Sequence, residues 1–378
     1  MLYWLLFQVL QKHIPAFRVF GYITTRVALA NLTALFLALA LGPWMIRKLR
    51  EFSFGQHIRE DGPQSHQKKA GTPTMGGLLI VVSIVVPTLL WANLANQYVW
   101  IALFGLLAFG TIGFFDDYTK IVKKRNLGLT SRQKFWAQVF CAMLIGFLLL
   151  LLHSHQAYST AVNVPFFKQF KPDLLIEPLT KNFWTYPLAF VLFYTFIVFI
   201  MVASSNAVNL TDGLDGLAAG LMVIAAGAMT ALAYVSSHLE FSKYLGLARL
   251  PNSQELTIFC AAMVGATLGF LWYNCHPAQV FMGDVGSLAL GGGLGVVAVL
   301  IKQEILLVFV GGVFVIETLS VILQVGSFRL RGGKRIFKMA PIHHHFEALG
   351  CPESKVIIRF WIAGLVMALF ALTTLKLR

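Results

Sequence analysis

The stretch Ala70–Phe115, AGTPTMGGLLIVVSIVVPTLLWANLANQYVWIALFGLLAFGTIGFF, contains no aspartate, glutamate, lysine or arginine in 46 consecutive residues. A helix that crosses the hydrocarbon core of a bilayer needs about 20 mostly apolar residues, so this stretch is long enough for two crossings. Asn93 and Asn96 lie near its middle and mark a turn between them. The stretch therefore predicts two consecutive transmembrane helices.

The same pattern recurs along the chain on both sides of this stretch. Eight further runs are apolar and carry few or no charged residues: 27–46, 135–167, 182–211, 216–239, 256–283, 285–301, 305–325 and 357–375. Together they predict an all-α, polytopic integral membrane protein with about ten transmembrane helices. No long linker or internal repeat divides the chain, so we expect residues 1–378 to form a single transmembrane domain.

The composition agrees with a membrane protein and excludes other classes. Hydrophobic residues make up 57% of the 378 residues and charged residues only 12%, whereas a soluble domain has roughly 25% charged residues. The mean hydropathy is +0.73, which excludes a soluble globule and a disordered chain. The net charge of +14 fits cytoplasmic loops beside anionic lipids, so we expect no nucleic-acid partner. The four scattered cysteines argue against a disulfide scaffold or a zinc site.

Lysine and arginine set the expected orientation in the membrane. Alternate loops carry 18 of these residues, against 11 on the opposite side. The positive-inside rule places the richer set in the cytoplasm and both termini on the periplasmic or extracytoplasmic side. The expected cytoplasmic loops are 47–74, 118–134, 204–215, 274–287 and 326–358. Residues 1–22 are expected to form an interfacial N-terminal helix.

Five of the seven aspartates fall in the expected cytoplasmic loops and helix ends. They are Asp116, Asp117, Asp212, Asp215 and Asp284. A single loop aspartate is most simply a helix cap or a solvated side chain. Because charges at the edge of a membrane are costly and are often functional, five on one face indicate a shared site at that face.

Two of the aspartate motifs favour a cation. In Gly113–Tyr118, GFFDDY, the adjacent carboxylates repel each other, which favours a bound cation or a raised pKa on one of them. In Phe281–Ser287, FMGDVGS, Asp284 stands among small residues at an expected helix start. That position suits phosphate oxygens bridged by a metal ion.

The third aspartate motif combines amides, carboxylates and glycines. In Asn206–Gly216, NAVNLTDGLDG, Asn209 and Asp212 are three residues apart, as are Asp212 and Asp215. Residues at this spacing share one face of a helical turn. The glycines allow a ligand to approach the backbone closely.

Three consecutive histidines, His343, His344 and His345, lie in the segment PIHHHFE of residues 341–347. Neighbouring side chains diverge and rarely hold one zinc ion together. Basic residues precede the histidines, so we predict phosphate contacts. Lys69, beside a glycine- and threonine-rich turn, is a weaker candidate for binding an anionic headgroup.

Acidic residues for a hard divalent cation, surrounded by basic residues, describe a site for a diphosphate substrate. At a cytoplasmic membrane face, the natural substrates are a soluble nucleotide diphosphate and a lipid phosphate. The side-chain pattern by itself predicts phosphoryl transfer between them.

Together these motifs closely resemble the signatures of the phospho-N-acetylmuramoyl-pentapeptide-transferase family. The aspartate pair and the Asn206–Gly216 motif are shared with the wider polyprenyl-phosphate N-acetylhexosamine-1-phosphate transferases, whereas the triple-histidine segment is more specific to this family. The resemblance covers nearly the whole chain. It implies a Mg²⁺-dependent enzyme of the bacterial cytoplasmic (inner) membrane. Such an enzyme forms lipid I and UMP from UDP-MurNAc-pentapeptide and undecaprenyl phosphate among membrane lipids, usually as a homodimer.

The resemblance also implies roles for individual residues. Asp284 would be the metal ligand, and Asp116, Asp117 and His343 would act with it in catalysis. The residues expected to bind the nucleotide sugar are Lys69, Asn209, Asp212, Gly213, Leu214, Asp215, Asn274, Phe281, His344 and His345.

Two questions stay open at this point. A sister N-acetylglucosamine-1-phosphate transferase would keep the aspartates but should lack the triple histidine. An ion-coupled transporter would place acids such as Glu317 near the midplane in paired repeats. The transfer itself is either direct attack with Asp116 as base, which we favour, or a two-step reaction through a covalent phospho-enzyme.

Overall fold

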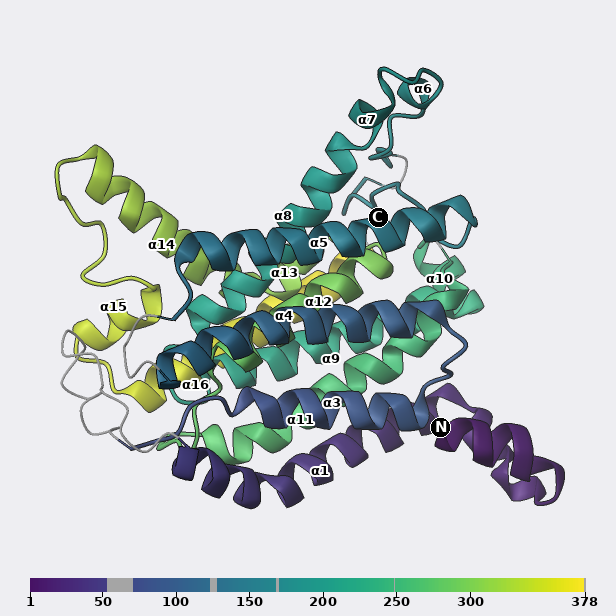
Figure 1. Ribbon diagram of the computed structural model, residues 1–378, viewed down its shortest axis with the longest axis horizontal. Helices are drawn as coiled ribbons and strands as arrows, with labels where there is room; N and C mark the ends of the chain where they lie inside the picture. The colour runs from purple at the N-terminus through teal and green to yellow at the C-terminus, as the bar shows by residue number, and fades with distance from the viewer. Residues whose placement is uncertain (53–70, 123–127, 168–169, 248, 377–378) are drawn as a thin grey trace.

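The computed structural model describes residues 1–52, 71–122, 128–167, 170–247 and 249–376. Long helices lie side by side in one bundle, with shorter helices at its two ends (Figure 1). The long helices are α1 (Ile23–Phe52), α3 (Gly77–Trp91), α4 (Gln97–Val122), α5 (Ser131–Ser154), α8 (Val191–Thr211), α9 (Leu217–Ser237), α11 (Leu256–Asn274), α12 (Gly283–Leu300), α14 (Gly312–Leu330) and α16 (Glu353–Thr374).

The all-α membrane fold expected from the sequence is confirmed. Within the described part of the chain, nine helices are long and apolar enough to cross a membrane, and α3 is a shorter apolar helix of 15 residues. The expected span at the start of the quoted stretch is shortened because residues just before α3 pair with a distant loop. Phe281 donates its backbone N–H to Pro73 O, and Gly76 donates to Phe281 O.

The short elements lie outside this set of long helices. They are η1 (Trp4–Val9), η2 (Leu10–Lys12), η3 (Pro15–Gly21), α6 (Glu177–Thr180), α7 (Tyr186–Ala189), α10 (Leu239–Leu245), η4 (Pro251–Glu255), α13 (Leu307–Val310) and α15 (Ile342–Ala348). The segment expected to be an interfacial helix is therefore three short helices, which project from the bundle at the start of α1 (Figure 1). Its contact with a membrane stays a prediction.

Helix α12 is the centre of the bundle. Every residue from Val285 to Leu300 is buried, and α12 packs against α4 on one side and α8 on another. Its many glycine and alanine residues allow backbones to approach closely, as in other membrane helix bundles. The buried helix holds its first turn, and with it Asp284, in a fixed position within the bundle.

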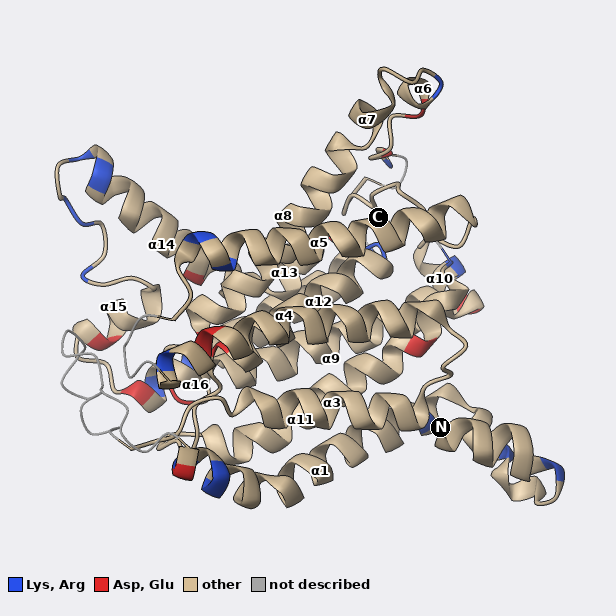
Figure 2. Ribbon diagram, in the orientation of Figure 1, with Lys and Arg blue, Asp and Glu red and all other residues tan. Residues whose placement is uncertain are grey.

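The described parts of the connections expected in the cytoplasm lie at one end of the bundle. The ends of α1, α4, α8 and α11 and the starts of α3, α5, α9 and α12 lie at the left in Figure 1. Figure 2 shows charged residues toward the two ends of the helices, with long uncharged stretches between them. The described parts of the aspartate motifs therefore share one end, while its orientation toward the cytoplasm stays a prediction.

Candidate active site

Three aspartates from two helices meet at this end. Asp116 and Asp117 lie near the end of α4, and Asp284 lies in the first turn of α12. Each offers one carboxylate oxygen, and these oxygens lie within 4.8 Å of one another. Asp117 Oδ2 also accepts the backbone N–H of Val285 at 3.2 Å, which ties the two helices together.

A glycine allows α4 and α12 to come this close. A methyl group added at Gly113 would lie 2.1 Å from the carbonyl oxygen of Asp284. Real Cβ atoms do not approach backbone oxygen at that distance, so only glycine fits without moving a helix. Gly113 stands one turn before Asp117, and its small size thereby brings the carboxylates together.

Two lysines that we did not predict neutralise part of this charge. Lys120 Nζ contacts all three carboxylates, with Asp117 Oδ1 at 3.2 Å and Asp284 Oδ2 at 3.0 Å. Lys134 Nζ lies 3.0 Å from Asp284 Oδ2. Lys120 follows the aspartate pair at i+4 and i+3, which is a helical signal for contact that could have identified it. The start of α5 supplies Lys134, and no local pattern joins it to Asp284.

The donor set suits a hard divalent cation. Mg²⁺ prefers carboxylate oxygens and is commonly held by one or two of them together with substrate phosphates. The ammonium group of Lys120 contacts all three carboxylates, so the cluster already coordinates a positive charge. The residues present therefore fit a magnesium ion.

Asn209 extends the cluster toward α8. Its amide donates to Asp284 Oδ1 at 2.7 Å and to Ser287 Oγ at 2.8 Å. Its carbonyl oxygen accepts from Lys134 at 3.3 Å. The metal candidate Asp284 is thus held from α4, α5 and α8 at once.

A cavity of about 350 Å³ opens beside the cluster. Its wall combines the carboxylates with the turn between α8 and α9 and the loop before α12. The lining residues are Thr74, Asp117, Lys120, Asn209, Asp212, Gly213, Leu214, Asp215, Asn274, Phe281, Gly283 and Asp284. Seven of the ten residues expected to bind substrate are in this lining, although they come from distant parts of the sequence.

Among the cavity-lining residues that lie outside the helices, Asp212 has the most strongly shifted pKa. Its enclosure, and then the negative charges of Asp284 and Asp117, raise the pKa of Asp212 to about 8. A carboxyl group in this setting is stabilised by any cation that binds nearby. The raised pKa of Asp212 therefore reflects the negative charge that neighbouring carboxylates place at this wall.

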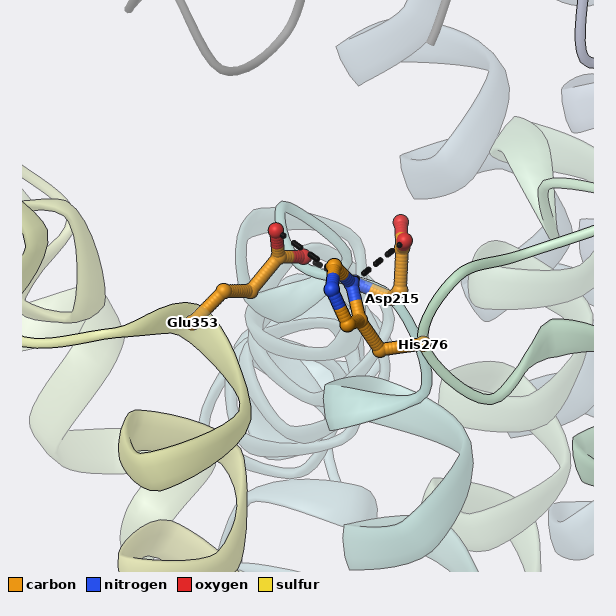
Figure 3. A group of neighbouring side chains, drawn as sticks. All are labelled: Asp215, His276 and Glu353. Atoms are coloured by element: carbon orange, nitrogen blue, oxygen red, sulfur yellow. Dashed lines mark hydrogen bonds and ion pairs between the residues drawn. The ribbon is translucent and has the colours of Figure 1, made fainter. Parts of the chain in front are cut away.

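The side chains of Asp215, His276 and Glu353 interact and hold the turn that contains Asp215 (Figure 3). Asp215 Oδ2 lies 3.1 Å from His276 Nδ1 and also accepts the backbone N–H of Ala278 at 3.1 Å. Glu353 Oε1 accepts the backbone N–H of Asp215 at 3.0 Å. Asn274 adds a fourth tie, because its Oδ1 accepts the N–H of Gly216 at 3.1 Å. Sequence reasoning missed His276 and Glu353, whose contacts with Asp215 are not local.

The three histidines have different surroundings. His343 is fully buried, and its Nδ1 lies 3.0 Å from Glu317 Oε2. His344 Nδ1 lies 2.7 Å from Glu347 Oε2, within the same short helix. His345 Nδ1 accepts the backbone N–H of Lys338 at 3.1 Å and so faces the segment between α14 and α15. Their contact with phosphate stays a prediction, as does that of Lys69, which lies outside the described residues.

Comparison with known proteins agrees with this geometry. Residues 99–302 match the family model of glycosyl transferase family 4, and residues 69–81 match the phospho-N-acetylmuramoyl-pentapeptide-transferase signature 1. The chain is 65% identical to the phospho-N-acetylmuramoyl-pentapeptide-transferase of Solibacter usitatus, with all of both chains covered. The proteins of the same name from Koribacter versatilis and Acidobacterium capsulatum are 62% and 61% identical, again over all of both chains. The chain therefore belongs to the phospho-N-acetylmuramoyl-pentapeptide-transferase family.

Proposed function

We propose that this multi-pass membrane protein transfers phospho-N-acetylmuramoyl-pentapeptide from UDP-MurNAc-pentapeptide to undecaprenyl phosphate, releasing UMP and forming lipid I. The observation that carries the proposal is the meeting of Asp116, Asp117 and Asp284 beside a cavity lined by Asn209 and Asp212. Carboxylates for a divalent cation, next to an enclosed wall of amides and glycines, suit a nucleoside diphosphate.

The cation we propose is Mg²⁺, held by Asp284 with Asp117 and Asp116 beside it. When bound, it would neutralise charge on the phosphates as it develops in the reaction. The chain's own contribution is to position the ion's ligands, with Asn209 and Lys134 fixing both oxygens of Asp284. Lys120 adds a second positive charge that can face the phosphates.

A second hollow supports a lipid acceptor. An apolar groove of about 230 Å³ lies between α8 and α14, and its lining includes Phe199, Leu319 and Ile322, all exposed on the surface of the bundle. Ala207 and Val208 line the groove, and the next residue of α8, Asn209, lines the polar cavity. A polyprenyl chain in the groove would therefore have its phosphate beside the carboxylates.

We favour direct attack by an oxygen of the lipid phosphate on the β-phosphate of the donor, with UMP as the leaving group. Asp116 lies at the edge of the cluster, where its Oδ1 accepts the N–H of Leu129 at 3.0 Å. A phosphate monoester has a second pKa near ~6 and is mostly ionised at neutral pH, so Asp116 would mainly orient the phosphate and would remove a proton only from the fraction that is still protonated. We further propose that the protein works as a homodimer in the bacterial inner membrane, with this site facing the cytoplasm.

One assay tests the function. Purified protein is incubated with undecaprenyl phosphate, MgCl₂ and either UDP-MurNAc-pentapeptide or UDP-N-acetylglucosamine, and UMP and the lipid product are measured. We expect both products with the first donor only, and none when EDTA replaces MgCl₂. Turnover of the second donor would indicate the sister transferase, and a lack of UMP with either donor would contradict the proposal.

A further inference from the structure

Glu317 is a buried carboxylate in the middle of a predicted span. It lies on α14, has no exposed surface, and its Oε2 is 3.0 Å from Nδ1 of the equally buried His343. An acidic side chain at this depth is costly unless it is paired, and membrane proteins keep such groups mainly for function. The pair joins α14 to α15 across 26 residues of sequence.

The other ring nitrogen of His343 has a different environment. Nε2 is buried and has no hydrogen-bond partner among the residues that the structure describes. It faces Gly213, where an added methyl group would lie 2.3 Å from Nε2. Gly213 lines the polar cavity, so the imidazole ring lies directly against the turn that forms the cavity wall.

Glu317 interacts with only one ring nitrogen of His343, Nδ1, and the other nitrogen, Nε2, is left without a partner among the described residues. A carboxylate that accepts the Nδ1–H fixes the tautomer and the orientation of an imidazole ring. A buried ring nitrogen without a partner is energetically costly, so the position of the ring depends on the contact between Nδ1 and the carboxylate.

We propose that Glu317 is a positioning residue for the transfer reaction. It holds the ring of His343 against the turn at Gly213 and thereby fixes the part of the cavity wall that the nucleotide-sugar substrate would contact. This inference rests on the proposed function and assigns a role to the one acid in α14. Because Glu317 contacts His343 and is absent from the apolar lining of the groove, its effect should concern the nucleotide donor.

The test compares single and double variants in the UMP-release assay. Glu317→Gln should lower kcat/KM for UDP-MurNAc-pentapeptide by about 10- to 100-fold, since small misplacements of binding groups have effects of this size. The KM for undecaprenyl phosphate should stay within about 2-fold. In a His343→Ala background, adding Glu317→Gln should cause no further loss, because the two residues act as one unit. Glu317→Asp should recover part of the activity.

Ser320→Ala is the matched control. Ser320 is buried on the same helix, and its hydroxyl donates to the backbone oxygen of Glu317 at 2.6 Å without touching the carboxylate. We expect wild-type activity from it. Thermal melts of every variant identify loss of folding. If Glu317→Gln does not fold, Glu317→Gln with His343→Gln restores an uncharged pair and should match His343→Gln alone.

Two results would overturn the inference while leaving the proposed function intact. One is an active wild-type protein whose Glu317→Gln variant has an unchanged kcat/KM for the donor. The other is an equal loss from Glu317→Gln with and without His343, which would show a structural role. An inactive wild-type protein would instead reject the proposed function itself.

Discussion

The two ends of helix α12 both carry buried charges, yet they differ in their balance. At its start, Asp284 meets Asp116, Asp117 and, across the cavity, Asp212, while Lys120 and Lys134 supply the positive charge. Three carboxylates thus face two ammonium groups, and Asp212, whose pKa is raised to about 8, adds a fourth acidic group that is mostly neutral at pH 7. The site has an excess of negative charge and an open cavity of about 350 Å³.

Beyond the other end of α12, Lys302 and Glu304 form a balanced pair. Lys302 Nζ lies 2.8 Å from Glu304 Oε1 and 3.1 Å from the hydroxyl of Tyr158, and all three residues are buried. Burial raises the pKa of Tyr158 to about 12 and that of Glu304 above its usual range. The comparison teaches that an unbalanced charge, and not burial alone, indicates a binding site for a cation and an anion.

The largest expected effect comes from removing a ligand at the unbalanced end. Asp284→Asn replaces a charged oxygen by an amide, so we expect turnover to fall by at least about 10³-fold. The dependence on Mg²⁺ should disappear together with the activity. UMP release measured against MgCl₂ concentration checks this, and normal turnover at ordinary Mg²⁺ would move the ligand role to another residue.

A substitution of Asp116, at the same end of α12, distinguishes direct attack assisted by a general base from a reaction through a covalent phospho-enzyme. If Asp116 acts as a base, Asp116→Asn should lose less than the usual factor of about 10²–10⁴ near neutral pH, because the lipid phosphate is already mostly ionised there, and should regain part of that loss at higher pH. The regain is expected because the lipid phosphate then ionises without help. Turnover from pH 6 to 9, on protein whose fold is checked at each pH, is the measurement. A loss that is flat across pH would favour a covalent nucleophile.

A substitution at the balanced end should affect stability and leave the chemistry intact. Lys302→Met leaves Glu304 buried without its cation, which should cost about 3–5 kcal/mol of unfolding free energy. Thermal melts in detergent should show the loss, and Glu304→Gln added to it should recover most of the stability. Turnover per folded molecule should stay near wild type for Lys302→Met. A large fall in turnover would mean that the two ends are coupled.

The last prediction concerns the titration of Asp212. Its folded pKa of about 8 exceeds the unfolded value near ~3.9, so the folded protein binds more protons between these values. Stability without a divalent cation should therefore fall as pH rises from about 4 to 8. Asp212→Asn should flatten this fall in EDTA, and MgCl₂ should reduce the difference. If the melting temperatures of the two proteins change equally with pH, the raised pKa assigned to Asp212 is wrong.

The sequence was sufficient to predict most of the fold and the meeting of the aspartates. Apolar runs of about 20 residues define membrane helices, and their alternation assigns Asp116, Asp212 and Asp284 to the same end before any contact is known. Glycine-rich motifs at those helix ends added the cavity residues. These predictions succeed because they depend on the length of the apolar runs and on the alternation of successive loops between the two sides of the membrane.

The rest depends on contacts between distant segments. Lys134 and Glu353 reach the site from helix starts whose paths no local pattern encodes. The shortening of α3 follows from its pairing with the loop at Phe281, which is about 200 residues away in the sequence. Glu317 was seen as an unusual acid, but only the structure reveals His343 as its partner.

The apolar groove between α8 and α14 has a kinetic consequence. Phe199, Leu319 and Ile322 line it and are exposed on the side of the bundle, so an acceptor in it would arrive by lateral diffusion within the bilayer. The donor would arrive from water in three dimensions. The rate of product formation would then follow the mole fraction of acceptor in the membrane, and added inert lipid would slow the enzyme although the bulk acceptor concentration stays constant.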